Sequence, residues 1–257
     1  MVWEVSLDYG LTGKVAIVTG GTRGIGRAIA DSLAAAGCRT YVCARSKPDD
    51  LPDSLEYRTL DVRDADAVDS FVNEIAAEAG SVDILVNNAG GSPASDAATA
   101  SPRFADAITK LNMLAPYYLA RAAHPHMKAA GGGAIINIAS VSGIRPSPST
   151  AIYGASKAGL LSLTKSLAQE WGPEAIRVNA IIVGLAETEN SEETYGDDAA
   201  RARIAKSLPL GRMVQGEDVA RAVLYLASEA SDYVSGAHLN VDGGGERPLF
   251  LDLIKEG

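Results

Sequence analysis

The amino-acid sequence predicts one α/β domain, with a doubly wound parallel sheet of seven strands and helices on both of its faces. Short runs rich in Val and Ile alternate with longer, Ala-rich amphipathic segments along the 257 residues. The apolar runs are continuous rather than alternating, as in strands that are covered on both faces. We find no linker, repeat or low-complexity segment, so a single domain is expected over residues 1–257.

Seven segments have the composition of strands. They are residues 14–20, 40–46, 56–62, 82–90, 134–140, 177–184 and 238–244. Segments of helical length between them would serve as crossover helices, the first of them at residues 27–37. The acidic and polar stretch at 187–203 interrupts this pattern before the apolar continuation at 204–210. Residues 187–207 are therefore either a mobile lid over a site or a solvated surface helix.

The composition excludes several classes of protein. A formal net charge of −9 and scattered Lys and Arg residues oppose binding to a phosphate backbone, so nucleic acid is not expected as a partner. No run approaches the roughly 18 apolar residues of a membrane span, and the N-terminal segment has no long apolar core. Cys38 and Cys43 lack CxxC or metal-ligand spacing, and His124, His126 and His238 lack the spacing of a helical metal site. We expect a soluble cytoplasmic protein with no metal and two structural cysteines.

The stretch TGGTRGIG, residues 19–26, places four glycines between the first predicted strand and the first predicted helix. Side chains at this turn would keep a ligand away from the first N–H groups of the helix, where the dipole and unpaired donors favour phosphate. The turn is therefore a candidate pyrophosphate cradle. Tight packing is the alternative explanation of such a turn.

The spacing of this turn, TGxxxGxG, resembles that of the short-chain dehydrogenase/reductase family. Other motifs of the family follow in its order: NNAG at 87–90, KLNM around Asn112, IASVSG around Ser140 and YGASK from Tyr153 to Lys157. The likeness extends from Thr12 to about Gly245. It implies a Rossmann fold and hydride transfer between a nicotinamide cofactor and a carbonyl or secondary alcohol, as in the family's ketoreductases and 3-oxoacyl reductases.

The resemblance also implies the residues of the site. The catalytic residues would be Asn112, Ser140, Tyr153 and Lys157. The cofactor would contact Gly20, Thr22, Arg23, Gly24, Ile25, Gly26, Asp61, Val62, Asn88, Ala89, Gly90, Tyr153, Lys157, Ala186 and Thr188. Asp61 and Val62 would lie against the adenine, and Asn112 would hold a water that links Lys157 to solvent. A homodimer or homotetramer is implied as well, packed through the helix at 112–127 and the helix of Tyr153.

The chemistry of the catalytic candidates agrees with these roles. Tyr153 and Lys157 stand four residues apart at the start of a predicted helix, so both side chains project from one face. The nearby ammonium would favour the phenolate and lower the pKa of the phenol. The Ser140 hydroxyl, just past a strand, could hold the substrate oxygen, and Ser142 would border the substrate pocket. Taken singly, each residue also has an ordinary structural explanation, such as a turn or an amphipathic helix rim.

The end of the second predicted strand bears on the choice of cofactor. Ala44 stands where a carboxylate would accept a hydrogen bond from the ribose of NAD, and Arg45 follows it. Arg23 in the glycine turn adds a second guanidinium, and guanidinium suits a 2′-phosphate by charge and geometry. The sequence therefore favours NADP(H) over NAD(H). The alternative is that Arg23 and Arg45 are surface residues.

The sequence leaves the loop after Gly184, the identity of the substrate and the type of activity undetermined. Val183 and Gly184 stand where the family usually has proline and glycine, which leaves the following loop undetermined. Pocket walls are expected from Gly91, Ser92, Pro93, Ser142, Ile144, Arg145 and Tyr195. They do not define one small-molecule substrate, and Arg145 is either a solvated loop residue or a contact for an acidic substrate. A noncatalytic dinucleotide sensor or assembly subunit, and a dehydratase or epimerase, are the alternative functions.

Overall fold

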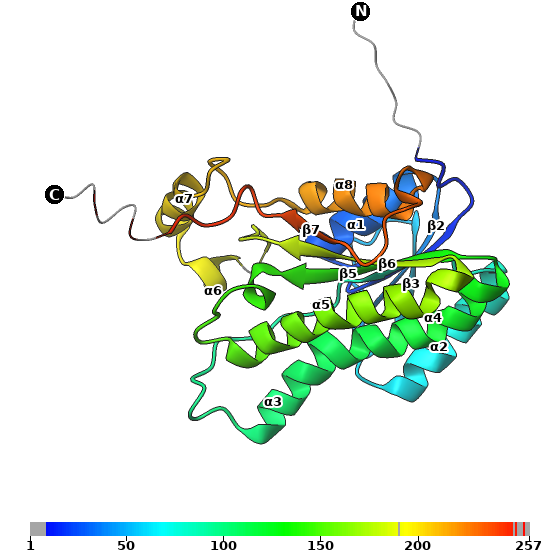
Figure 1. Cartoon of the computed structure of the whole chain (residues 1–257), viewed down its shortest axis with the longest axis horizontal. Helices are drawn as coiled ribbons and strands as arrows, with labels where there is room; N and C mark the ends of the chain where they lie inside the picture. Colours follow the sequence, from blue (N-terminus) through cyan, green and yellow to red (C-terminus); the bar gives the residue numbers. More distant parts are fainter. Residues whose placement is uncertain (1–8, 190, 249, 251–253, 255–257) are drawn as a thin grey trace, which may run out of the picture.

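Within the described part of the chain, seven parallel strands form the central sheet (Figure 1). The structure is a computed structural model that describes residues 9–189, 191–248, 250 and 254. The strands lie in the order β3-β2-β1-β4-β5-β6-β7. Their bounds are β1 Val15–Thr19, β2 Arg39–Ala44, β3 Leu55–Thr59, β4 Ile84–Asn87, β5 Gly133–Ser140, β6 Ile176–Val183 and β7 His238–Val241. The order reverses between β1 and β4, so the carboxyl ends of these two strands mark the point where doubly wound proteins bind ligands.

Helices cover both faces of this sheet (Figure 1). On one face, α1 (Gly24–Ala35) packs beside α8 (Gly216–Ala227). The other face carries α2 (Ala65–Ala79), α4 (Ala115–Ala129) and α5 (Ala151–Trp171). Three shorter helices lie outside these layers: α3 (Pro102–Thr109), α6 (Ser191–Tyr195) and α7 (Asp198–Ser207). Figure 1 shows α6 and α7 beyond the arrowheads of β5 and β6, so these helices stand at the carboxyl edge of the sheet.

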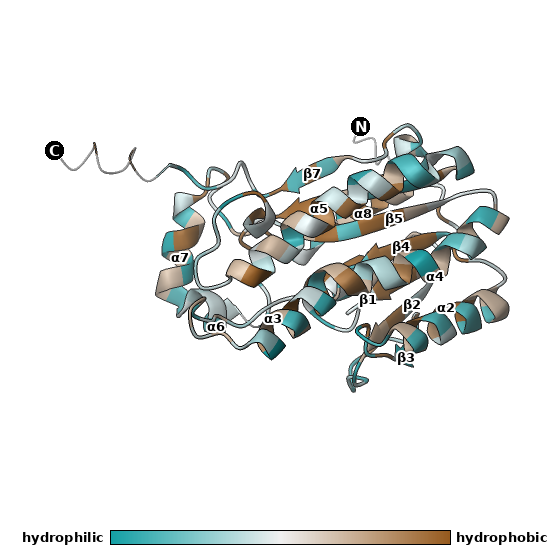
Figure 2. Cartoon of the chain, turned by 60° about the horizontal axis from the view of Figure 1, so that its bottom comes forward, coloured by the Kyte–Doolittle hydropathy of each residue, from teal (hydrophilic) through white to brown (hydrophobic). Residues whose placement is uncertain are grey.

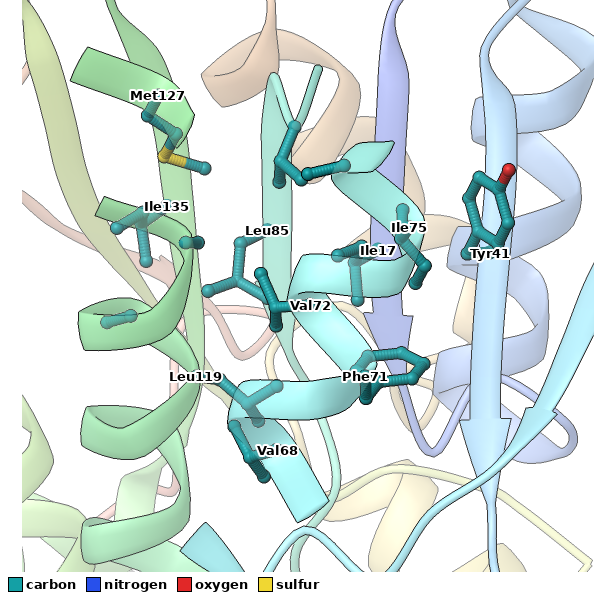
Figure 3. Packing of buried hydrophobic residues seen from close by; sticks show 14 of the residues in the cluster. Ile17, Tyr41, Val68, Phe71, Val72, Ile75, Leu85, Leu119, Met127 and Ile135 are labelled. Carbon is teal, nitrogen blue, oxygen red and sulfur yellow. The ribbon is translucent and has the colours of Figure 1, made fainter. Parts of the chain in front are cut away.

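The central strands are buried between two apolar layers. Figure 2 shows β4 largely brown, while β7 at the edge of the sheet is partly teal and the helices carry a mixture of teal, white and brown. In the layer of α2 and α4, drawn in Figure 3, the labelled side chains are Ile17, Tyr41, Val68, Phe71, Val72, Ile75, Leu85, Leu119, Met127 and Ile135. A fully buried Val, Leu, Ile or Phe side chain contributes about 1.5–3 kcal/mol. The densely packed sheet is thus a rigid support for the side chains at its strand ends.

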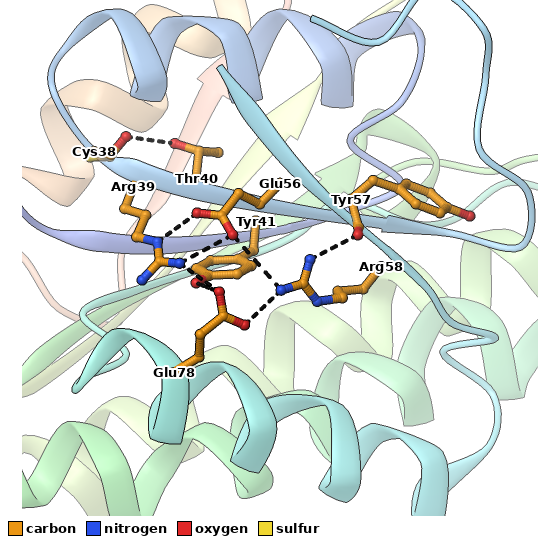
Figure 4. Close-up of polar contacts among 8 residues, drawn as sticks. All are labelled: Cys38, Arg39, Thr40, Tyr41, Glu56, Tyr57, Arg58 and Glu78. Atoms are coloured by element: carbon orange, nitrogen blue, oxygen red, sulfur yellow. Dashed lines mark hydrogen bonds and ion pairs between the residues drawn. The ribbon is translucent and has the colours of Figure 1, made fainter. Parts of the chain in front are cut away.

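A polar cluster covers the open end of the sheet at β2 and β3 (Figure 4). The guanidinium carbons of Arg39 and Arg58 lie 5.1 and 5.4 Å from the centroid of the Tyr41 ring. The carboxylate of Glu78 accepts hydrogen bonds from both guanidinium groups, at 2.6 Å each, and from the Tyr41 hydroxyl at 3.1 Å. Arg39 belongs to β2, Arg58 to β3 and Glu78 to α2, so the cluster joins these two strands to the helix that covers them.

The sheet and the helical layers confirm the predicted fold class, and three local features differ from the prediction. Helix α1 begins at Gly24 rather than at residue 27, because the last glycines of the turn form its first helical turn. A π-helical turn at Lys110–Leu114 precedes α4, which starts only at Ala115. The stretch at 187–207 contains two short helices, α6 and α7, instead of one.

The described part of the chain contains no membrane span, no cluster of metal ligands and no disulfide. No helix in this part is long and apolar enough to cross a bilayer, and no three His, Cys, Asp or Glu side chains converge as metal ligands there. Cys38 and Cys43 are buried and form no disulfide with each other. Burial raises the pKa of these thiols to about 11 and about 12, which keeps both protonated and unreactive at neutral pH.

Candidate active site

The glycine turn between β1 and α1 combines close packing with an uncapped helix N-terminus. A Cβ atom on Gly26 would lie 2.2 Å from the carbonyl oxygen of Gly20, so no side chain fits there. Gly20 and Gly24 have φ values of +63° and +53°, which glycine adopts without strain. The N-cap residue Arg23 makes no side-chain capping hydrogen bond. Close packing therefore explains why residue 26 is a glycine. Because Arg23 does not cap the helix, the N–H groups in the first turn of α1 need a hydrogen-bond acceptor from outside this turn.

The loop after β4 is tied to this turn. Thr19 closes β1, and its buried hydroxyl oxygen accepts hydrogen bonds from the backbone N–H groups of Asn88 and Ala89, both at 3.0 Å. The side-chain amide of Asn88 donates in return to the carbonyl oxygens of Thr19 and Gly20, at 2.9 and 3.2 Å. The two loops that the sequence assigns to a cofactor thus form one hydrogen-bonded unit at the reversal point of the sheet.

Tyr153 and Lys157 extend from the first turns of α5 toward the end of β5. Lys157 is only 4% exposed, and its Nζ donates a hydrogen bond of 2.7 Å to the carbonyl oxygen of Ile138. The same nitrogen lies 5.7 Å from the centroid of the Tyr153 ring. Ser140, the last residue of β5, lies close enough to the Tyr153 phenol to lower its pKa. The structure therefore brings the predicted tyrosine, lysine and serine together.

The pKa values of this group follow from its burial. Desolvation raises the pKa of the Tyr153 phenol, the hydrogen bond from Ser140 lowers it, and nearby Tyr195 raises it again. Desolvation lowers the pKa of Lys157 to about 8. The net direction for Tyr153 is opposite to the lowering expected from Lys157, because desolvation of the phenol is the largest influence on its pKa.

Asn112 is fully buried in the π-helical turn before α4. Its amide nitrogen donates to the carbonyl oxygens of Ile108 and Gly91, and its oxygen accepts from the N–H of Gly91, each at 2.9 Å. A Cβ atom on Gly90 would lie 2.8 Å from Asn112 Oδ1 and 3.2 Å from Lys157 Nζ. The asparagine and the lysine thus meet at one glycine of the NNAG motif. π turns of this kind frequently occur at functional sites.

The two serines after β5 have different surroundings. The Ser140 hydroxyl accepts a hydrogen bond of 3.2 Å from the backbone N–H of Ser142 and also meets Tyr153. The Ser142 hydroxyl has no hydrogen-bond partner within the described residues. The backbone carbonyl oxygen of Ser142 lies 2.8 Å from the position that a Cβ atom on Gly154 would take. This close approach explains why a glycine follows Tyr153. Ser140 is therefore the serine placed to act with Tyr153.

The arginines predicted to select the cofactor lie at the carboxyl end of β2 and the start of α1. Arg23 and Arg45 are exposed, and neither guanidinium has an ion-pair or hydrogen-bond partner in the described chain. Asp61, after β3, is held by hydrogen bonds from the Arg63 guanidinium, which lower the pKa of the carboxyl to about 2. Arg45 is close enough to Asp61 to lower the pKa of its carboxyl as well, but only Arg63 forms hydrogen bonds with it. Both exposed guanidinium groups, of Arg23 and Arg45, therefore keep their hydrogen-bond donors available to a ligand.

Val183 extends β6 where the family usually has proline. It pairs with Ser140 on one side and with Val241 on the other, so the strand is regular up to this residue. Gly184 follows, and a Cβ atom there would lie 2.7 Å from the Cα of Asp242. The loop toward the lid therefore leaves the sheet at Gly184, whose lack of a side chain permits the close approach of the chain after β7.

The remaining predicted cofactor residues fall into three places. Thr22 and Ile25 are half-buried in the glycine turn, and Val62 is buried in the layer of α2. Ala186 pairs with Val214 in an isolated bridge, which anchors the loop after β6. Thr188 follows this bridge and begins the turn into α6.

Tyr195, at the end of α6, connects the catalytic group to the rim of the site. It influences the pKa of Tyr153, and its own pKa is raised by burial and lowered by a hydrogen bond from the backbone of Ala186. Arg145 and Glu246 also influence Tyr195, and Arg145 Nε lies 2.5 Å from Glu246 Oε2. Arg145 is exposed on the loop after β5, as expected of a solvated loop residue, and Glu246 compensates its charge.

Three participants were missed by the sequence reasoning: Thr19, the carbonyl of Ile138, and Glu189. Thr19 stands in the glycine motif, but its link to Asn88 depends on the neighbouring strand. A backbone carbonyl such as that of Ile138 has no sequence signature. Glu189 Oε1 accepts a hydrogen bond of 3.0 Å from the N–H of Gly24, although the two residues are 165 positions apart. Only its position next to Thr188 could have drawn attention to it.

The chain is similar to known reductases and dehydrogenases. Residues 20–246 match the family described as "Enoyl-(Acyl carrier protein) reductase". The chain is 36% identical to the 2-dehydro-3-deoxy-D-gluconate 5-dehydrogenase of Escherichia coli over 92% of its own length and 96% of the relative's. It is also 36% identical to the 3-oxoacyl-[acyl-carrier-protein] reductase of Chlamydia muridarum, covering 91% of this chain and 98% of that one.

A solved structure extends the likeness to three dimensions. The gluconate 5-dehydrogenase of Burkholderia cenocepacia, in complex with NADP and tartrate, superposes with a TM-score of 0.86 at 34% identity. The alignment covers 93% of this chain and 98% of that one. The likeness therefore includes the whole sheet and its helical layers.

Proposed function

This chain belongs to the short-chain dehydrogenase/reductase family, and we propose that it transfers a hydride between NADP(H) and a carbonyl or secondary alcohol with Tyr153 as acid/base. It is an oxidoreductase that uses a nicotinamide cofactor, in keeping with its relatives. The observation that carries the proposal is the meeting of Ser140, Tyr153 and Lys157, with the lysine beside Gly90 in the loop after β4. A noncatalytic sensor would have no use for this group.

The donors around the glycine turn fit a dinucleotide. The N-terminus of α1 already binds one anion, the carboxylate of Glu189, so its N–H groups are directed at a ligand position. The exposed guanidinium groups of Arg23 and Arg45 would hold a 2′-phosphate, and Ala44 presents no carboxylate to repel it. The NADP in the related gluconate 5-dehydrogenase supports this choice.

The proposed mechanism assigns one task to each side chain. When bound, the nicotinamide supplies or accepts the hydride. During reduction, the Tyr153 hydroxyl donates its proton to the substrate oxygen, while the Ser140 hydroxyl donates a hydrogen bond to the same oxygen. The Lys157 ammonium, held by Ile138, stabilises the phenolate that results. Asn112 would hold a water through which the proton returns to Tyr153. The reverse sequence oxidises an alcohol.

The surroundings of the catalytic group support a small-molecule substrate under a lid. Residues 187–207 would form this lid, since Tyr195 of α6 lies within electrostatic reach of Tyr153. We further propose a homodimer or homotetramer packed through α4 and α5, because α5 exposes the small residues Ala155, Ala158 and Ser162. The two buried thiols suit a reducing compartment, and we propose the cytoplasm.

The test is a turnover assay. The purified protein is mixed with NADPH and a panel of ketones, or with NADP and the matching alcohols, and the absorbance of NADPH at its nicotinamide band is followed. We expect consumption or formation of NADPH with at least one substrate class. Binding of NADPH without turnover across a broad panel would favour the noncatalytic alternative. Product analysis by chiral chromatography separates oxidoreduction from dehydration and epimerisation.

A further inference from the structure

We propose that Glu189 is a tethered anion that occupies the pyrophosphate position at the start of α1, so that NADP(H) must displace it to bind. Glu189 would thereby set the affinity for the cofactor and assist its release. This inference rests on the proposed cofactor, but it concerns a residue to which the proposed reaction gives no task.

The contact itself involves the whole carboxylate. Oε1 of Glu189 accepts a hydrogen bond of 3.0 Å from the N–H of Gly24, the first residue of α1. Oε2 lies 3.3 Å from where a Cβ on Gly24 would stand, so both oxygens face this glycine. Arg23 supplies no cap of its own. A carboxylate 165 positions away in the sequence thus caps α1 at its N-terminus, where the helix dipole attracts an anion.

The backbone around Glu189 holds it in this direction. The N–H of Thr188 donates to the Ser191 hydroxyl at 2.6 Å, and the N–H of Ser191 donates to the Thr188 carbonyl at 3.0 Å. Ser191 is 4% exposed and fixes the turn against the body of the protein. Thr188 Cγ2 lies 3.7 Å from the Cβ position of Gly24, so the turn itself packs against the start of α1. Glu189 therefore reaches the glycine turn from a short, well-anchored support.

The carboxylate and a diphosphate cannot both use this position. A single N–H group donates to one acceptor at normal geometry, and two anions at one helix N-terminus repel each other. Glu189 is exposed and has no ion pair with Lys or Arg in the described chain, so nothing but the helix N-terminus compensates it. The neighbouring Glu187 differs, because it accepts a hydrogen bond of 2.9 Å from the side chain of Gln215. Glu189 can thus move into water when a stronger anion arrives.

Two measurable effects follow from this competition. The apparent Kd for cofactor equals the intrinsic Kd divided by the fraction of protein with the position open, so a capped helix weakens binding. As the cofactor leaves, Glu189 can take over the N–H of Gly24, which favours dissociation. A charge-assisted hydrogen bond of this kind shifts an equilibrium by roughly tenfold or more.

The experiment compares three variants with the wild type in direct binding. Glu189→Gln removes the charge, Glu189→Ala removes charge and acceptor, and Glu74→Gln removes an equal charge from an exposed residue of α2, outside the lid, as the control. The Kd for NADPH is measured by titration of its fluorescence, and the dissociation rate by stopped-flow displacement. Inorganic pyrophosphate serves as a second probe in competition titrations, and thermal unfolding shows that every variant is folded.

We expect both Glu189 variants to bind NADPH and pyrophosphate about tenfold more tightly, with slower NADPH dissociation, while Glu74→Gln stays within about twofold of the wild type. Unchanged or weaker binding by folded Glu189 variants would overturn the inference, since Glu189 would then be neutral or a support for the cofactor. An equal gain in Glu74→Gln would also overturn it in favour of a general charge effect. If the wild type bound neither NADPH nor NADH, the proposed function would fail, and this inference with it.

Discussion

The ammonium nitrogen of Lys157 lies 2.7 Å from the backbone carbonyl oxygen of Ile138, and this hydrogen bond joins α5 to β5. Ser140 stands two residues further along the same strand and meets the phenol of Tyr153. Strand β5 pairs with β4 on one side and with β6 on the other. One rigid strand therefore sets the positions of both the lysine and the serine relative to the tyrosine.

The tyrosine is tested by removing a single oxygen. Tyr153→Phe should lower kcat by about 10²-fold or more, the usual scale for loss of a general acid/base. The Kd for NADPH should remain near that of the wild type, because the glycine turn and the arginines are untouched. Steady-state kinetics and fluorescence titration measure the two quantities. A variant with near wild-type turnover would falsify the assignment of Tyr153 and revive the sensor alternative.

The two serines offer a matched pair of substitutions. Ser140→Ala should lower kcat strongly, because a hydrogen-bond donor to the substrate oxygen worth about 3 kcal/mol is lost. Ser142→Ala should change mainly KM, since the Ser142 hydroxyl does not meet Tyr153 and would border only the substrate. Both constants are measured with one substrate at saturating NADPH. The reversed pattern would identify Ser142 as the catalytic serine.

Cofactor choice is tested with the double variant Ala44→Asp, Arg45→Ala. The new carboxylate repels a 2′-phosphate and accepts a hydrogen bond from a free 2′-hydroxyl, while the lost guanidinium removes a charge-assisted contact of about 1.5–3 kcal/mol. NADPH should bind roughly ten- to a hundredfold more weakly, and NADH should bind more tightly.

The comparison requires kcat/KM for both cofactors in the wild type and the variant. Arg23→Ala alone should weaken NADPH without affecting NADH. A wild type that already prefers NADH, or an unchanged ratio in the double variant, would show that Arg23 and Arg45 are surface residues.

The burial of Lys157 predicts that the free energy of unfolding depends on pH. Desolvation lowers the pKa of Lys157 from 10.5 to about 8, so above pH 8 the unfolded chain binds more protons at this residue than the folded one. The stability of the wild type should therefore rise with pH, by about 2 kcal/mol between pH 7 and 9.5 relative to Lys157→Met. Urea unfolding of both proteins at several pH values measures the difference. A difference that is independent of pH would mean that Lys157 titrates near its ordinary value.

Local patterns in the sequence were sufficient for the fold and for most of the catalytic group. Continuous Val- and Ile-rich runs predicted the parallel strands, because burial on both faces requires apolar residues at every position. The four-residue spacing of Tyr153 and Lys157 placed them on one helix face, and Ser140 was placed at the end of a strand. These features depend on neighbours along the chain, which a sequence displays directly.

The tertiary structure decided what depends on distant contacts and on burial. It determined the direction of the pKa shift at Tyr153, because the cost of desolvation depends on how many elements cover the ring. It placed Asn112 in a π-helical turn, which the spacing of residues in the sequence does not predict. It also formed a hydrogen bond between the Glu189 carboxylate and the N–H of Gly24, which are 165 positions apart in the sequence. Such a contact arises only when the turn after β6 packs against the start of α1, and local periodicity contains no information about that packing.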